Sequence, residues 1–204
     1  MFTLYQCKPA FQNWLRPVVH RLATWGVTPN QVTVAALVAS GAMGLAITLW
    51  PQAHWVLLGL PVLLLGRMAL NAIDGMLARE HNLTTPLGCL LNEVGDVLSD
   101  SWLYLPFCFL PAVSAPWIVT IVLLAILSEM VGVLGLAIAQ KRVYEGPMGK
   151  SDRAFVFGSV GLALGLGLEP APWLTGLWLV VIGLQLWTLV NRTRSILREA
   201  SPWL

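Results

Sequence analysis

Charged side chains are scarce in this 204-residue chain. Only 11% of its residues are Asp, Glu, Lys or Arg, whereas 57% are apolar, and the mean hydropathy is +0.73. A soluble domain needs a larger charged fraction to cover its surface, so the composition excludes an ordinary soluble protein and predicts an integral membrane protein. The scarcity also makes each charge inside an apolar run informative, because such a group is costly unless it is paired or functional.

Cysteine is rare as well. Cys7, Cys89 and Cys108 cannot form a disulfide framework, and the last two lie in apolar segments, as is typical of small buried residues. The opening stretch FTLYQCKPAFQNWLRP has no continuous apolar core, so we expect no cleavable signal peptide. Internal repeats and low-complexity segments are absent from the sequence, and we expect a single membrane domain over residues 1–204.

Apolar runs of about 20 residues, the length that crosses a bilayer as a helix, are frequent. The charge-free stretch 101–128 is too long for one span, and Pro111 and Pro116 bracket a turn inside it. We therefore predict an all-α integral membrane protein with six transmembrane helices in up-and-down order and a core at residues 31–193. The expected spans are residues 32–50, 55–73, about 87–110, about 116–140, 154–168 and 170–190.

Basic residues are missing from three of the expected turns, 51–54, 111–116 and 169–172. All twelve Lys and Arg residues lie on the other side, so the positive-inside rule predicts that both termini and that face are cytoplasmic, in the plasma (inner) membrane. The opposite face carries the aromatic belt expected at a membrane interface, formed by Trp50, Trp55, Trp117 and Trp173.

The segment before the first span is amphipathic. Its apolar residues recur at positions i, i+3, i+4 and i+7, and they are Phe11, Trp14, Leu15, Val18, Val19, Leu22 and Trp25. This pattern predicts an interfacial helix over residues 9–25 on the cytoplasmic leaflet. A helix docked on the bundle is compatible with the same pattern.

Costly polar residues collect at one depth, at the end of the second expected span and the start of the third. Because the two helices are antiparallel neighbours, their polar faces meet, and converging oxygen ligands from two helices suit a hard cation such as magnesium or manganese. Small residues nearby leave room for a ligand. The polar residues are Asn71, Asp74, Arg79, Asn92, Glu93, Asp96 and Asp100, and the small ones are Gly75, Ala78 and Gly88.

A purely structural interpretation is that these carboxylates pair with Arg67 and Arg79 at the helix ends. One such pair would be ordinary. Four acidic and two amide side chains on two facing helices, beside small residues, are difficult to explain in that way. The pattern therefore favours a functional site.

The segment NAIDGMLAREHNLTTPLGCLLNEVGD resembles the signature D-x2-D-G-x2-A-R-x8-G-x3-D-x3-D of the CDP-alcohol phosphatidyltransferases. Every spacing matches. The resemblance covers most of the chain, since VTPNQVT is similar to the start of the family's first span and GPMGKSDRA to its basic loop between the fourth and fifth helices. Six helices are also the family's usual number.

Two positions depart from the signature: Asn71 and Asn92 stand where the family has its first and third aspartates. An asparagine offers a carbonyl oxygen to a cation but no charge. The departure predicts weaker metal binding and puts a two-metal site in doubt. One metal could remain, Glu93 could restore a carboxylate, or the site could be inactive. Both changes are conservative and the rest of the signature is intact, which favours activity.

The resemblance implies an enzyme of phospholipid biosynthesis that moves a phosphatidyl group from CDP-diacylglycerol to a small alcohol and releases CMP. It implies Asp96 as the catalytic base and a Mg or Mn ion held by Asp74, Asn71, Asn92, Asp96 and Glu93. The remaining implied contacts, to the CDP-lipid, are Asn30, Thr33, Gly75, Ala78, Arg79, Thr85 and Gly88.

The acceptor alcohol is less determined. In members that use a phosphorylated polyol such as glycerol phosphate, basic residues of the loop after the fourth helix bind the phosphate, so Lys150 and Arg153 are candidates for acceptor binding. Equally, they could be positive-inside residues that contact anionic headgroups. Glu129, in the middle of the fourth span, is interpreted as a protonated or hydrogen-bonded structural residue or a dimer contact.

A second hypothesis is a catalytically silent relative that binds a lipid or nucleotide-lipid in a regulatory or scaffolding role, supported by Asn71 and Asn92. A third, a small transporter, would need polar residues that cross to the outer face, and the sequence has almost none there. We expect contacts with membrane lipids and a homodimer, as is common in the family, and no nucleic-acid partner.

Overall fold

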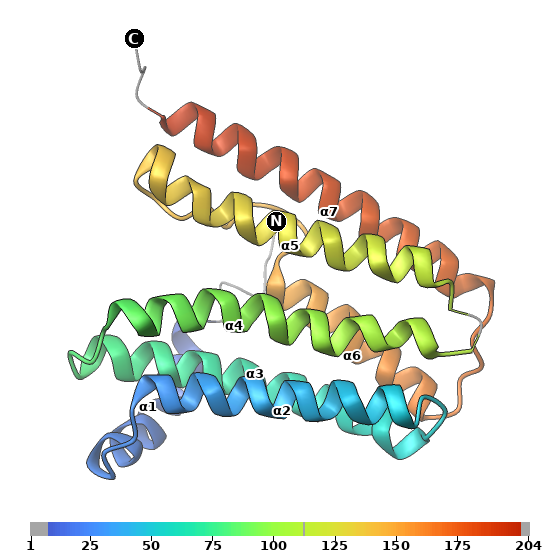
Figure 1. Cartoon of the computed structure of the whole chain (residues 1–204), viewed down its shortest axis with the longest axis horizontal. Helices are drawn as coiled ribbons and strands as arrows, with labels where there is room; N and C mark the ends of the chain where they lie inside the picture. Colours follow the sequence, from blue (N-terminus) through green and yellow to red (C-terminus); the bar gives the residue numbers. More distant parts are fainter. Residues whose placement is uncertain (1–7, 112, 201–204) are drawn as a thin grey trace.

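The structure, a computed structural model, describes residues 8–111 and 113–200, and within these ranges all regular elements are helices (Figure 1). The predicted all-α class is confirmed. The elements are α1 (Lys8–Thr24), α2 (Pro29–Leu49), α3 (His54–Glu80), α4 (Pro86–Tyr104), the 3-10 helix η2 (Leu105–Phe109), α5 (Ala115–Ala139), α6 (Lys150–Gly165) and α7 (Pro172–Glu199).

Helices α2 to α7 occupy the six expected segments, but their lengths differ from the hydropathy pattern. α3 continues past Ile73 to Glu80 and α7 past Val190 to Glu199, because helix propensity, unlike hydropathy, does not stop where the apolar run stops. Within the described residues, α2, α3, α5 and α7 are long and apolar enough to cross a membrane. α6 has only 16 residues, and α4 carries three acidic residues.

The helices pack as connected pairs. α2 packs against α3 and α4, α3 also contacts α6, and α5 packs along α7 (Figure 1). The α2–α4 contact is close, since a Cβ atom added to Gly44 would lie 2.0 Å from the carbonyl oxygen of Trp102. A glycine at this crossing lets two backbones touch, which is how helices commonly associate in membranes.

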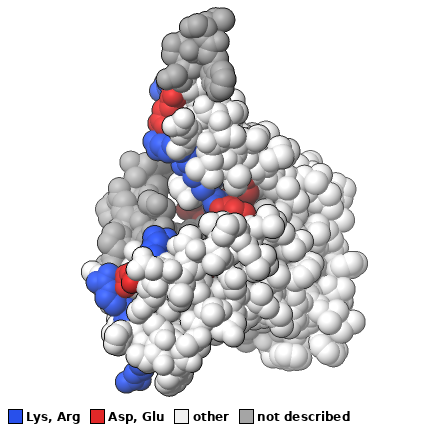
Figure 2. Space-filling view, turned by 60° about the vertical axis from the view of Figure 1, so that its left-hand side comes forward, with Lys and Arg blue, Asp and Glu red and all other residues white. Residues whose placement is uncertain are grey.

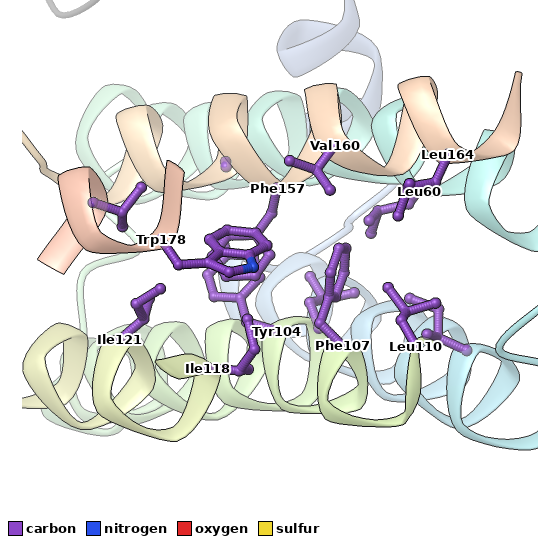
Figure 3. Packing of buried hydrophobic residues seen from close by; sticks show 14 of the residues in the cluster. Leu60, Tyr104, Phe107, Leu110, Ile118, Ile121, Phe157, Val160, Leu164 and Trp178 are labelled. Carbon is purple, nitrogen blue, oxygen red and sulfur yellow. The ribbon is translucent and has the colours of Figure 1, made fainter. Parts of the chain in front are cut away.

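An aromatic cluster joins α4, η2, α6 and α7 (Figure 3). The Phe157 ring stacks on Tyr104 at a centroid distance of 4.1 Å and on Trp178 at 5.1 Å, and Phe107 meets it edge-on at 4.9 Å. Such pairs contribute about 0.5–1.5 kcal/mol each beyond the area they bury. The cluster begins one turn beyond Asp100, so it fixes α6 and α7 against α4 next to the polar residues.

Helix α1 packs on α3 through part of its apolar face. Leu15 and Val19 are buried in a small cluster with Ile73, Met76 and Leu77. Phe11 and Leu22 pack against this cluster, whereas Trp14, Val18 and, just after the helix, Trp25 are exposed. The docking seen in the structure thus leaves apolar surface for a second contact.

The segment 140–149 folds back along the α5–α7 pair. α5 ends at Gln140 in the left-handed conformation (φ 53°), and the next residues run so close to α5 that a Cβ on Gly135 would lie 2.6 Å from the carbonyl oxygen of Lys141. Further along, the backbone N–H of Met148 donates to Thr188 Oγ1 of α7 at 2.9 Å. As a result α6 begins inside the bundle and not at its end (Figure 1).

Candidate active site

A cavity of about 780 Å³ lies where α2, α3, α4, α5, α6, α7 and the segment 140–149 meet. Figure 2 shows charged side chains gathered in a band on this side of the molecule, with little charge over the rest of that view. Thirteen of the fourteen predicted site residues line the cavity: Asn30, Thr33, Asn71, Asp74, Gly75, Ala78, Arg79, Thr85, Gly88, Asn92, Glu93, Asp96 and Lys150. The exception is Arg153.

The starts of α2 and α4 lie at the cavity, and both are capped. Thr28 and Gln31 form a capping box around the start of α2, with Pro29 as the first helical residue. Thr85 caps α4 by accepting a hydrogen bond from the Gly88 N–H at 3.0 Å. The unpaired N–H groups of these two helix starts give this end of the cavity a positive backbone potential.

The end of α3 lines the same end of the cavity as the starts of α2 and α4. Asn82 adopts the left-handed conformation (φ 57°) and the Leu83 N–H donates to the Ala78 carbonyl at 2.9 Å, which terminates the helix just after Arg79 and Glu80. The guanidinium of Arg79 lies against Gly75, where an added Cβ would be 3.2 Å from Nη1.

Two glycines in the cavity wall leave room for neighbouring polar side chains. A Cβ on Gly88 would lie 2.7 Å from Asn30 Oδ1, so glycine at this position leaves room for the Asn30 side chain between α2 and α4. Gly75 similarly makes room for the Arg79 side chain. The two glycines of the signature therefore leave space beside the cavity for the polar side chains of Asn30 and Arg79.

Two carboxylates face the cavity from opposite helices. Asp74 is buried and accepts a hydrogen bond from the Thr33 hydroxyl at 2.8 Å. Asp96 Oδ1 accepts from the Asn71 side-chain amide at 3.2 Å and contacts the Lys150 ammonium. The Arg67 guanidinium lies 3.6 Å from the same oxygen. Asp96 is thus surrounded by donors, whereas Asp74 has one neutral donor side chain.

The donor set fits one hard divalent cation. Among the described residues no cluster of three or more His, Cys, Asp or Glu side chains is placed to hold a metal ion. What the site offers is the carboxylates of Asp74 and Asp96 with the side-chain carbonyls of Asn71 and Asn92. Mg²⁺ is commonly held by one or two carboxylates and completed by substrate phosphates, so two carboxylates and two amides are sufficient.

Arg153 lies beneath the cavity and not on its wall. Its side chain is fully buried and donates to Asp100 and Glu129, both at 3.1 Å. Asp100 also accepts from Arg67 at 2.5 Å. These pairs indicate a structural role for Asp100 and Arg153, because a buried ion needs a partner of opposite charge.

Glu129 is the centre of this buried network. Besides Arg153, it has Arg142 at 3.4 Å and Arg192 at 3.7 Å. The sequence hypothesis of a hydrogen-bonded structural glutamate agrees with these contacts, but its partners and its place on the cavity wall were not predicted. The available signal was that Glu129 is an isolated charge within an apolar run and that Arg192 is the first charge after another such run.

Lys141 lies at the outer rim of the cavity, outside the helices. Its ammonium donates to Glu199 at 2.9 Å. This hydrogen bond and the neighbouring carboxylate charge raise the pKa of Lys141 above its ordinary value. The rim cation therefore stays protonated at neutral pH.

The fold and the cavity define an all-helical membrane protein with a charged, oxygen-rich site at the ends of its helices. Residues 26–197 match the family described as CDP-alcohol phosphatidyltransferase. The chain belongs to this family, whose members are enzymes that transfer phosphatidyl groups, and the resemblance found in the sequence is confirmed.

Relatives agree with this assignment. The chain is 49% identical over 195 residues, 96% of each chain, to the inner membrane protein YnbA of Escherichia coli. It also resembles the phosphatidylinositol phosphate synthase PgsA1 of Mycobacterium tuberculosis at 19% identity. The form with CDP-DAG bound matches with a TM-score of 0.73 over 88% of this chain and 92% of that one. The form with manganese and citrate gives 0.74 over 92% and 90%.

Proposed function

We propose that the protein transfers a phosphatidyl group from CDP-diacylglycerol to the hydroxyl of a small alcohol and releases CMP. The main supporting observation is that thirteen of the fourteen residues singled out by the signature and the sequence pattern line one cavity. Family membership supports the reaction class, and a CDP-DAG complex of a protein with the same fold supports the donor.

The donor diphosphate would bind between the starts of α2 and α4 and Arg79. Helix starts bind phosphate through free N–H groups. Among the described cations that line the cavity, Arg79 is the one without an ion-pair partner, so it can bind a phosphate without first losing a carboxylate. Asn30, Thr33, Ala78, Thr85 and the backbone at Gly75 and Gly88 would surround the nucleotide and its phosphates.

A Mg or Mn ion would be held by Asp74 and Asp96 with Asn71 and Asn92, and Glu93 stands nearby. When bound, it would neutralise diphosphate charge as the CMP leaving group departs. Thr33 would orient Asp74 for this role through its 2.8 Å hydrogen bond. A manganese complex of a protein with the same fold is consistent with a divalent ion.

Asp96 would act as the general base. The acceptor oxygen attacks the phosphorus of the phosphatidyl group, the P–O bond to CMP breaks, and the hydroxyl proton passes to the Asp96 carboxylate. Lys150 and Asn71 contact Asp96 Oδ1 and would fix its orientation. A base and a phosphate site in one cavity supply the proximity that such a transfer requires.

The proposed setting is the plasma membrane, with six spans, α1 at the interface, and both termini and the cavity on the cytoplasmic side. Charge placement by the positive-inside rule supports this orientation, the inner-membrane relative supports the membrane, and exposed Trp14 and Trp25 support the role of α1. We retain a homodimer as part of the proposal on the strength of the family resemblance alone.

Release of CMP by purified protein in lipid micelles tests the proposal. The mixture contains CDP-diacylglycerol, Mg²⁺ or Mn²⁺ and a panel of alcohols. We expect release that depends on an alcohol and a metal, falls by at least about a hundredfold in Asp96→Asn, and persists in Glu80→Gln, which changes an exposed helix-end carboxylate outside the cavity. Absence of release with every alcohol and both metals would reject the transferase.

A silent, lipid-binding relative is the second candidate, favoured by Asn71 and Asn92 and by the Lys150–Asp96 pair, which occupies the proposed base. The double variant Asn71→Asp/Asn92→Asp separates the two. Activity that appears only in the variant would identify the natural protein as silent. Activity already present in the natural protein, with a changed metal preference in the variant, would identify the amides as tuning residues.

A further inference from the structure

The cavity has two ends that differ in their charges. The donor end is the wall made by α2, α3 and the start of α4, and it contains Arg79 and Asp74. The acceptor end is the wall made by the rest of the lining, from α4, α5, the segment 140–149, α6 and α7. Its charged residues are Glu93, Glu129, Lys141, Arg142, Glu145, Lys150, Asp152 and Arg192. Asp96 lies between the two ends, in contact with α3 and α6.

Cations of the acceptor end are paired with carboxylates of the chain itself. Arg142 contacts Glu93 and Glu129, and Arg192 lies 3.7 Å from Glu129. Lys150 contacts Asp96. Lys141, at the rim, is held by Glu199, so each basic residue that lines this end has an acidic partner among the described residues.

The balance of charge points the same way. Among the described residues that line the whole cavity, six are acidic and five are basic, and the single unpaired base, Arg79, is at the donor end. A phosphorylated acceptor would have to displace Glu93 or Glu129 from an arginine. It would also place its own negative charges beside those carboxylates, and like charges in a half-buried site repel strongly.

We infer that the acceptor is an uncharged polyhydroxy alcohol and not a phosphorylated one; this rests on the proposed transferase function. Alcohol hydroxyls both donate and accept, so they can bind the ion pairs of the acceptor end without breaking them: carboxylate oxygens of Glu93 and Glu129 accept, and N–H groups of Arg142 and Arg192 donate. Arg153, buried beneath the cavity, serves to hold Glu129 in this arrangement.

Matched acceptor pairs test the inference. CMP release from CDP-diacylglycerol is measured with glycerol against glycerol 3-phosphate and with inositol against inositol phosphate. We expect kcat/KM to favour the uncharged member of each pair by at least about tenfold. Equal or better use of the phosphorylated member would overturn the inference and leave the transferase standing. No release with any acceptor would overturn both.

Variants that remove an acidic partner from a cation provide the control. Glu93→Gln leaves Arg142 with Glu129 as its remaining acidic partner, and Glu129→Gln frees more. Both are expected to shift the preference about tenfold toward the phosphorylated acceptor, whereas Glu80→Gln leaves it unchanged. Since Glu129→Gln can fail to fold, Glu93→Gln, which is half-buried, is the primary variant.

Thermal unfolding with inorganic phosphate gives a readout without turnover. With CDP-diacylglycerol present and no acceptor, so that the donor end is occupied, millimolar phosphate is expected to leave the natural protein's unfolding temperature unchanged and to raise that of Glu93→Gln. An equal stabilisation of both proteins would show that the natural acceptor end already binds phosphate, against the inference.

Discussion

The donor end and the acceptor end of the cavity hold their cations in different ways. At the donor end, Arg79 lies against Gly75 and has no ion-pair partner among the described residues. At the acceptor end, Arg142, Arg192 and Lys150 each contact a carboxylate. A paired cation must lose its partner before it binds an anion. The comparison therefore indicates that the cavity has one phosphate site that needs no ion pair to be broken, at Arg79 next to the helix starts.

The largest expected effect comes from the residue between the two ends. Asp96→Asn removes the proposed base while it keeps the shape of the side chain, so kcat for CMP release should fall by about a hundredfold to ten-thousandfold. Binding of CDP-diacylglycerol, measured separately, should persist. An active Asp96→Asn protein would exclude this residue as the base.

Beneath the acceptor end, Asp100→Asn removes the shared partner of two buried arginines, Arg67 and Arg153. We expect a loss of about 3–5 kcal/mol in unfolding free energy, because both guanidinium groups keep their charge in a buried place. Denaturant unfolding in micelles measures it, with Glu80→Gln as the exposed-pair control. A variant as stable as the natural protein would show that these contacts are not stabilising.

At the donor end, Arg79→Lys keeps the charge but loses the planar fork that can bind two phosphate oxygens. The KM for CDP-diacylglycerol should rise about tenfold, while the ratio between uncharged and phosphorylated acceptors stays constant. A change in that ratio would mean that Arg79 serves the acceptor, and the distinction between the two ends would fail.

The smallest expected effect is that of Thr33→Val, which removes the hydroxyl that donates to the buried Asp74 carboxylate. A hydrogen bond of this kind contributes about 1 kcal/mol, so Mn²⁺ affinity, measured by titration of the purified protein, should change by about fivefold. An unchanged Mn²⁺ affinity would show that the hydrogen bond from Thr33 to Asp74 does not contribute to metal binding.

The sequence alone predicts the helical class and the polar residues of α3 and α4 that meet in the cavity. Both follow from local rules: an apolar run of fixed length gives a helix, and the spacing of Asn71, Asp74, Asn92 and Asp96 places them on facing sides of an antiparallel pair. The helix caps at Thr28 and Thr85 are local features as well, but they were not predicted.

The acceptor end could not be predicted in the same way. It depends on the segment 140–149 folding back along α5 and α7, which rests on contacts between residues far apart in the sequence, such as Met148 with Thr188. That path carries Lys150 to Asp96 but turns Arg153 beneath the cavity to Glu129. Lys150 and Arg153 are three positions apart in α6, a spacing that places both on one side of a helix, so the sequence could not decide which of the two faces the ligand.

The mass of the lipid product is the most direct test of the account. Purified protein is incubated with CDP-diacylglycerol, a divalent cation and an equimolar mixture of glycerol and glycerol 3-phosphate, and the lipids are analysed by mass spectrometry. The account predicts a phosphodiester lipid of the uncharged alcohol, formed in step with CMP. A product that carries the additional phosphate, or phosphatidic acid formed without any acceptor, would contradict it.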